Sequence, residues 1–146
     1  MKRRILITLL AAAAMFGQQP ASQSAAKSPA PKSKTLTRAE LDALLAKPET
    51  VLVIDVRRPD ELTAKGGFPV YLSIQAADLE KLLAYIPKDR TIVTVSNHAA
   101  RGLKAADLLD SKGFHVAGAI GAENYEAEGG TLLKIAAPKP EAGAKH

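Results

Sequence analysis

Hydrophobic residues in the middle of the chain occur in two patterns, short continuous runs and helical spacing. Residues 51–56 are apolar except for Asp55, and residues 92–95 form a second run of this kind. Strands without polar alternation are typical of a parallel sheet that is covered on both faces. Between such runs, apolar residues recur every three or four positions, as they do over residues 99–112. This alternation of strands and helices predicts an α/β fold.

The other elements are predicted from residues that cap or end helices. Residues 37–40 read Thr-Arg-Ala-Glu, a capping box before a helix that ends by Pro48. Pro59 begins a short helix, and Gly113 stands where a helix ends in a left-handed residue. We also expect a weak strand at 70–74, a helix at 78–84, a strand at 114–120 and a short helix at 122–128. The result is a single domain with a mainly parallel central sheet flanked by helices on both faces.

The two ends of the chain differ from this middle part. Residues 1–26 have the pattern of a secretory signal peptide, with a basic start at 2–4, an apolar run at 5–16 and small residues at 24–26. The run is too short to span a bilayer, which needs about 20 apolar residues. We interpret 27–35 as a disordered spacer, 36–130 as the domain and 131–146 as a flexible tail. The expected location is therefore periplasmic or secreted, with no stable membrane span after the signal is removed.

Charge and cysteine content exclude several functions. The net charge of +5 comes from the ends, because residues 37–130 hold 11 Lys and Arg against 14 Asp and Glu. A mildly acidic domain is a poor nucleic-acid binder, since binding to phosphates needs clustered cations. The chain contains no cysteine and only three scattered histidines. We expect no metal site and no cofactor, and thiolate chemistry is excluded.

The candidate functional residues lie where two predicted strands end. Asp55 and Ser96 stand at the carboxyl ends of predicted parallel strands, where α/β sheets bind their ligands. The loop after residue 95 leads into a helix, so its backbone N–H groups and the helix N-terminus could hold an anion. The predicted ligand-binding loop consists of Ser96, Asn97, His98, Ala99, Ala100, Arg101 and Gly102, with Asp55 and Arg57 in support.

Four segments, spread over about residues 36–130, resemble rhodanese-like domains. Residues 53–57 (Val-Ile-Asp-Val-Arg) are similar to the family strand that ends in Asp-Val-Arg, and residues 66–74 occupy the place of its Gly-His-Ile-Pro-Gly-Ala-Ile-Asn-Ile segment. Residues 92–109 match the active-site loop and its helix without a gap, and residues 114–128 resemble the closing strand and helix. The loop length of six residues fits the sulfurtransferase branch of the family rather than the dual-specificity phosphatases.

The departures from the family pattern concern the chemistry. Family loops resemble Cys-Arg-Ser-Gly-Asn-Arg, whereas residues 96–101 read Ser-Asn-His-Ala-Ala-Arg. Arg101 is kept, but the sulfur-carrying cysteine is Ser96 and the loop glycine is Ala99. In the second segment Gly67 replaces a histidine and Val70 replaces a glycine. The resemblance therefore implies the fold without sulfurtransferase activity.

Several roles stay open at this level. Arg101 opens a helix, where the macrodipole disfavours a cation, so it needs Asp55, Glu61 or a bound anion as a partner. Arg57 and Arg58 are interpreted as surface residues of a turn, and His98 as a solvated side chain.

The expected function is that of an exported, catalytically inactive rhodanese-like domain that binds a small anion or a protein partner in the envelope. One alternative is a hydrolase or transferase that uses Ser96 with His98 as its base. Another is a remnant that serves only as a scaffold.

Overall fold

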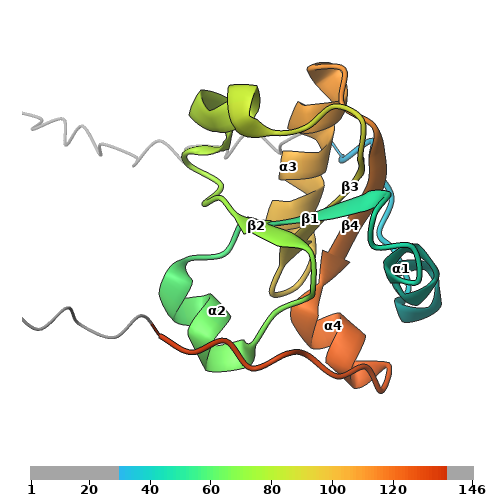
Figure 1. Cartoon of the computed structure of the whole chain (residues 1–146), viewed down its shortest axis with the longest axis vertical. Helices are drawn as coiled ribbons and strands as arrows, with labels where there is room; N and C mark the ends of the chain where they lie inside the picture. The colour runs from blue at the N-terminus through green and yellow to red at the C-terminus, as the bar shows by residue number, and fades with distance from the viewer. Residues whose placement is uncertain (1–29, 138–146) are drawn as a thin grey trace, which may run out of the picture.

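The computed structural model describes residues 30–137, which form a four-stranded sheet with helices on both faces (Figure 1). The predicted signal peptide, most of the spacer and the end of the tail lie outside the described residues. The strands are β1 (Val51–Asp55), β2 (Tyr71–Ser73), β3 (Thr91–Ser96) and β4 (Val116–Gly121). They are all parallel, in the order β2-β1-β3-β4. The predicted fold class is confirmed.

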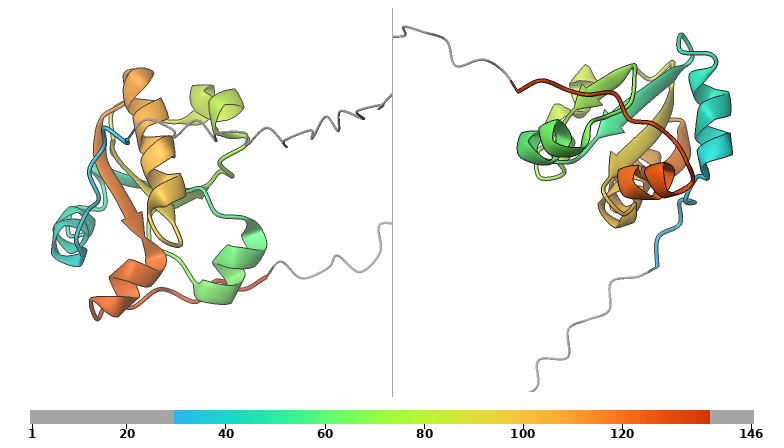
Figure 2. Two further views of the ribbon diagram at one scale, coloured as in Figure 1. Left: turned by 180° about the vertical axis from the view of Figure 1, so that it is seen from behind. Right: turned by 90° about the horizontal axis from the view of Figure 1, so that it is seen from below.

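Two apolar layers hold helices against this sheet. On one face, α1 (Arg38–Leu45) and α4 (Ala122–Ala127) cover the valines of β1 and β3. On the other, α3 (Ala100–Ser111) and the 3₁₀ helix η1 (Leu79–Tyr85) pack on the isoleucines of the same strands. Figure 2 shows α1 and η1 on opposite sides of the sheet. The remaining helix, α2 (Pro59–Lys65), follows β1 at the carboxyl edge of the sheet.

Local sequence signals explain where the elements begin and end. The Thr37 side chain accepts a hydrogen bond from the N–H of Glu40, and the Glu40 carboxylate accepts one from the backbone N–H of Thr37, so the predicted capping box is present. Gly113 has a φ of +80°, as expected for the residue that ends α3. The predicted strand at 70–74 is shorter than expected, and the helix at 78–84 has 3₁₀ geometry.

The packed part of the chain extends past the predicted domain boundaries of 36 and 130. Thr35 bridges Ala119 as a parallel extension of the sheet, and Leu133 pairs with Gly67. Leu132 is buried in the apolar layer beneath α1 and α4, with 8% of its surface exposed. The segment 131–137 is therefore packed on the domain at these residues, where the sequence predicted a flexible tail.

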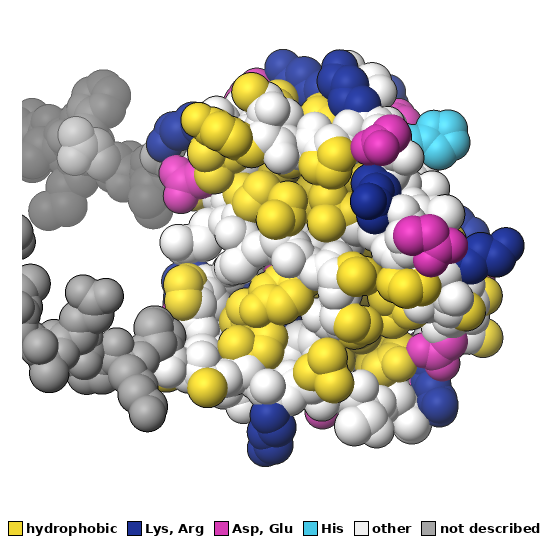
Figure 3. Space-filling model, viewed as in Figure 1, with side chains coloured by type: hydrophobic (Ala, Val, Ile, Leu, Met, Phe, Trp, Pro, Cys, Tyr) yellow, Lys and Arg dark blue, Asp and Glu magenta, His cyan; other side chains and the backbone are white. Residues whose placement is uncertain are grey.

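The surface formed by residues 30–137 exposes a few large apolar side chains. Val70, Tyr85 and Leu133 are the exposed large hydrophobic residues of the described part. On the face drawn in Figure 3, hydrophobic side chains gather in the middle and most charged side chains lie nearer the rim. None of the helices formed by residues 30–137 is long and apolar enough to cross a bilayer.

Candidate functional site

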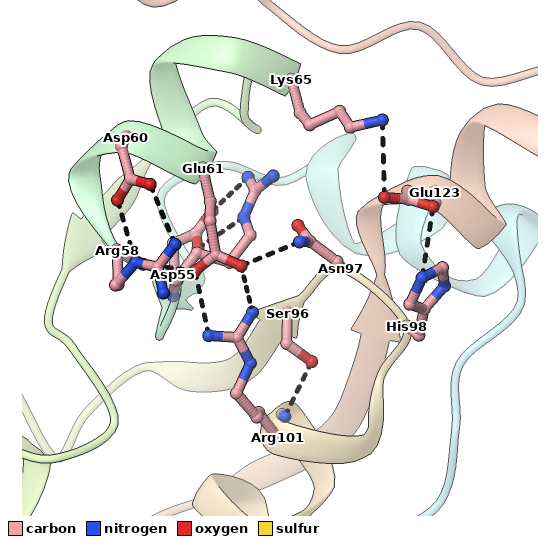
Figure 4. A network of polar contacts seen from close by, with 12 residues as sticks. Asp55, Arg58, Asp60, Glu61, Lys65, Ser96, Asn97, His98, Arg101 and Glu123 are labelled. Atoms are coloured by element: carbon pink, nitrogen blue, oxygen red, sulfur yellow. Dashed lines mark hydrogen bonds and ion pairs between the residues drawn. The ribbon is translucent and has the colours of Figure 1, made fainter.

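The site lies where β1 and β3 end side by side. Asp55 pairs in register with Val95, one residue before Ser96, so both strands deliver polar side chains to the same edge of the sheet. Figure 4 shows the loop after Ser96 facing α2, with the two elements joined by hydrogen bonds. The structure thus brings Asp55, Ser96 and the following loop together.

Ser96 is enclosed rather than presented to solvent. Alternation along β3 turns Ser96 and Thr94 toward α3, and Ser96 is only 1% exposed. Its Oγ accepts a hydrogen bond from the backbone N–H of Gly102 at 2.9 Å, and the Thr94 hydroxyl donates to the Gly102 carbonyl at 2.7 Å. A Cβ on Gly102 would lie 3.2 Å from Ala119 Cβ, so a glycine allows α3 to pack closely on the sheet here. The Ser96 hydroxyl therefore holds the start of α3 against the end of β3.

The loop keeps its bend without its glycine. Ala99 has a φ of +65°, the left-handed conformation that favours glycine, and it is nearly fully buried. The N–H of Ala100 bonds to the carbonyl of His98. Among the described residues, no protein acceptor takes the backbone N–H of Asn97, His98, Ala99 or Arg101. These four N–H groups are therefore donors that the described residues leave without an acceptor.

Glu61 of α2 joins the loop to the rest of the site. Its carboxylate accepts two hydrogen bonds from the Arg101 guanidinium, at 2.6 and 3.0 Å, and one from Asn97 Nδ2 at 2.9 Å. It also accepts from the N–H of Arg58, at the start of α2. The hydrogen bonds from Arg101 are the main reason that the pKa of Glu61 is lowered to about 2. Of the three partners considered for Arg101, the structure selects Glu61.

Asp55 and Arg57 form a buried ion pair. Arg57 is fully buried, and its guanidinium donates to both oxygens of Asp55 at 2.6 and 2.9 Å. It also donates to the Gly66 carbonyl at 2.8 Å, which ties the end of α2 to β1. The interpretation of Arg57 as a surface residue was wrong. That of Arg58 is confirmed, because it is exposed and pairs with Asp60.

His98 points away from Ser96. Its Nε2 lies 3.3 Å from the Glu123 carboxylate, which also meets Lys65, and the His98 side chain is 71% exposed. Figure 4 shows it on the far side of the loop from the Ser96 hydroxyl. A serine nucleophile needs its base within hydrogen-bond reach. This geometry disfavours the alternative based on Ser96 and His98.

The segment at 66–74, which departs from the family pattern, is packed against residues near the C-terminus. Val70 has a φ of +50°, a conformation that costs a β-branched residue free energy, at the position where the resemblance gives glycine. A Cβ on Gly66 would lie 2.5 Å from the Leu133 carbonyl oxygen, and one on Gly67 would lie 2.8 Å from Ile135 Cδ1. The segment 131–137 therefore packs against the place that the family fills with a histidine. Sequence reasoning missed this contact, and the glycine pair was the one signal for it.

Comparisons with known proteins agree with this geometry. No family model matches the chain. The chain is 26% identical over 108 residues to YtwF of Bacillus subtilis (strain 168), which is named a putative sulfurtransferase. The matched part makes up 74% of this chain and 96% of that protein. The chain is 34% identical over 74 residues to a sulfurtransferase of Allochromatium vinosum, covering 51% of this chain and 68% of that protein.

The chain belongs to the rhodanese-like family. The solved structure of a rhodanese-related protein from Thermoplasma volcanium has the same fold, with a TM-score of 0.61 and 20% identity over 70% of this chain and 99% of that one. This rhodanese-like domain carries no cysteine anywhere in its sequence. It keeps the loop, the helix after it and the arginine at the end of the loop.

Proposed function

We propose that this rhodanese-like domain does not transfer sulfur and acts instead as a binding module at the loop of residues 96–102. The observation that carries the proposal is Ser96 at the position of the sulfur-carrying cysteine. A serine hydroxyl cannot form a persulfide, and this one is buried and hydrogen-bonded to Gly102.

The loop geometry supports a binding role. Four backbone N–H groups in the loop have no acceptor among the described residues, and they lie at the start of a helix of twelve residues. The ionised side chains of the site are largely paired with one another, Arg57 with Asp55 and Arg101 with Glu61. A ligand therefore meets hydrogen-bond donors more than a net positive charge. We propose a small anion or an acceptor group on a protein partner as the occupant.

We also propose that the chain is exported. The basic start, the apolar run and the small residues within 1–26 support this proposal. Cell fractionation and the N-terminal sequence of the isolated protein test it. A protein that stays in the cytoplasm with Met1 intact would contradict it.

Two measurements test the binding module. Sulfate or phosphate at millimolar concentration should raise the melting temperature, because a ligand that binds the folded state stabilises it. The shift should be smaller in the Asn97→Pro variant, which removes one loop N–H together with the hydrogen bond from Asn97 Nδ2 to Glu61, than in the control Asn97→Ala, which loses only that side-chain bond. Absence of any shift, together with an envelope pull-down that is unchanged by Asn97→Pro and by Arg101→Gln, would contradict the proposal and favour a scaffold.

A further inference from the structure

A small hollow lies beside the loop, between α3 and the segment that leads into η1. Its volume is about 240 Å³. The floor is apolar, with Leu79 and Ala105 buried and Leu108 half-buried, and the exposed Ala76 forms one wall. Two cations, Arg101 and Lys104, complete the lining. They stand three positions apart on α3 and therefore share one face of the helix.

The two cations differ in how their charge is compensated. The Arg101 guanidinium is held by two hydrogen bonds from its nitrogens to Glu61, so its charge is largely neutralised. Lys104 is exposed, and within residues 30–137 its ammonium group has no ion pair or hydrogen bond to a side chain. The uncompensated positive charge of the hollow is thus that of Lys104, not that of Arg101.

Carboxylates near the hollow are already engaged with other groups. They are Asp78, which pairs with Lys81, Glu80, which pairs with Lys112, and Asp107, which accepts hydrogen bonds from the backbone N–H groups of Lys32 and Ser33. Within residues 30–137, none of these carboxylates forms an ion pair with Lys104.

An apolar floor beside one uncompensated cation selects a particular chemistry. An inorganic anion gains nothing from Leu79 and Leu108, whereas a neutral hydrocarbon gains nothing from Lys104. A ligand with a short aliphatic body and one carboxylate uses both parts, because burial of CH₂ groups and a charge pair at the rim add up.

We propose that this hollow binds a short-chain aliphatic carboxylate. Its hydrocarbon part lies over Leu79, Ala105 and Leu108, and its carboxylate meets the Lys104 ammonium group at the rim. The hollow lies beside the loop of the proposed function and shares Arg101 with it, and the inference goes beyond that function by adding a second site.

Ligand titration followed by ¹H–¹⁵N NMR spectra of the purified protein tests the inference. Hexanoate should shift the amide signals of Ala76, Leu79, Lys104, Ala105 and Leu108 in a saturable manner. Acetate, which lacks the hydrocarbon body, should bind at least about tenfold more weakly. Hexanol, which lacks the charge, should bind about two- to fivefold more weakly, because an exposed charge pair contributes up to about 1 kcal/mol. Sulfate should give no saturable shift at these amides.

Matched variants separate the charge from the shape. Lys104→Glu should weaken hexanoate binding by about tenfold or more, whereas Lys47→Glu, the same change just after α1, should leave it unaltered. Ala76→Trp should fill the hollow and block binding, whereas Ala77→Trp, at the exposed neighbouring position, should not. Both tryptophan variants retain every charge of the wild-type protein.

Three results would overturn the inference: hexanol or sulfate binding as tightly as hexanoate, unchanged binding in Lys104→Glu, or signal shifts away from the hollow. The outcome is independent of the sulfur-transfer assay. Sulfur transfer by the wild-type protein would refute the proposed function and leave the hexanoate titration standing, whereas loss of carboxylate selectivity would refute only this inference.

Discussion

Replacement of Asp55 by alanine should unfold the domain more readily than any surface substitution, because it leaves the Arg57 guanidinium buried without its counter-ion. Arg57 is fully buried, and Asp55 accepts hydrogen bonds from its Nε, its Nη2 and its backbone N–H. After the substitution, the Gly66 carbonyl would remain as the acceptor that the guanidinium has now.

The expected loss in the free energy of unfolding is about 3–5 kcal/mol, the usual cost of removing one partner of a buried ion pair. Such a loss is a large share of the roughly 5–15 kcal/mol that stabilises a small domain. At about 4–8 °C per kcal/mol for a domain of this size, the melting temperature should fall by at least ~12 °C.

Urea denaturation followed by circular dichroism measures the effect. The double variant Asp55→Ala, Arg57→Met is the control, because it removes the buried charge along with its partner and should recover most of the loss. Asp60→Ala removes a carboxylate from the exposed pair with Arg58 and should cost less than about 1 kcal/mol. A loss below 1 kcal/mol for Asp55→Ala, or a double variant less stable than the single one, would refute the reasoning.

Four further predictions follow from the site and its surroundings. Ala99→Gly should stabilise the protein by up to about 1 kcal/mol, because relief of the left-handed conformation (~1–2 kcal/mol) exceeds the loss of one buried methyl group (~0.8 kcal/mol); a clear loss of stability in urea would contradict this. Glu61→Gln should lower the melting temperature at neutral pH but not near pH 2. The folded-state pKa of Glu61 lies at about 2, below the ordinary value of 4.5, so its stabilisation is present above pH 4.5 and lost as the pH falls toward 2. A difference between the two proteins that is constant from pH 2 to 7 would exclude this linkage. Leu132→Ala should cost about 2 kcal/mol or more, since Leu132 is buried in the core, whereas Leu133→Ala at the exposed neighbour should cost much less; equal effects would mean that segment 131–137 does not pack as described. Ser96→Cys should restore little thiosulfate-to-cyanide transfer, because the new thiol would be buried and because the arginine that follows the family cysteine is replaced by Asn97. Full activity of this variant would mean that only the sulfur atom had been lost.

Local patterns in the sequence are sufficient to predict the frame of the site. Three signals depend on neighbouring residues only. They are the apolar runs that end near Asp55 and Ser96, the capping box at Thr37 and the glycine that ends α3. From these, the parallel sheet and the position of the loop at its carboxyl edge follow. The partner of Arg101 could be narrowed to Asp55, Glu61 or an anion, and only the structure shows that it is Glu61.

What could not be predicted depends on contacts between distant segments. The burial of Arg57 requires the Asp55 carboxylate and the Gly66 carbonyl together, and a charged residue beside a proline otherwise suggests a surface turn. The left-handed conformations of Val70 and Ala99 run against the preference of both residue types. Segment 131–137 contains Leu132, Leu133 and Ile135, but nothing in their spacing shows which part of the domain they contact, so their packing against Gly66 and Gly67 is seen only in the fold.

We propose that this rhodanese-like domain keeps the loop of residues 96–102 and does not catalyse sulfur transfer. Thiocyanate formation from thiosulfate and cyanide by the purified wild-type protein tests it most directly, with Ser96→Ala assayed beside it to identify contaminating enzymes. We expect no turnover above the background of the Ser96→Ala preparation. Turnover by the wild-type protein that disappears in Ser96→Ala would contradict it.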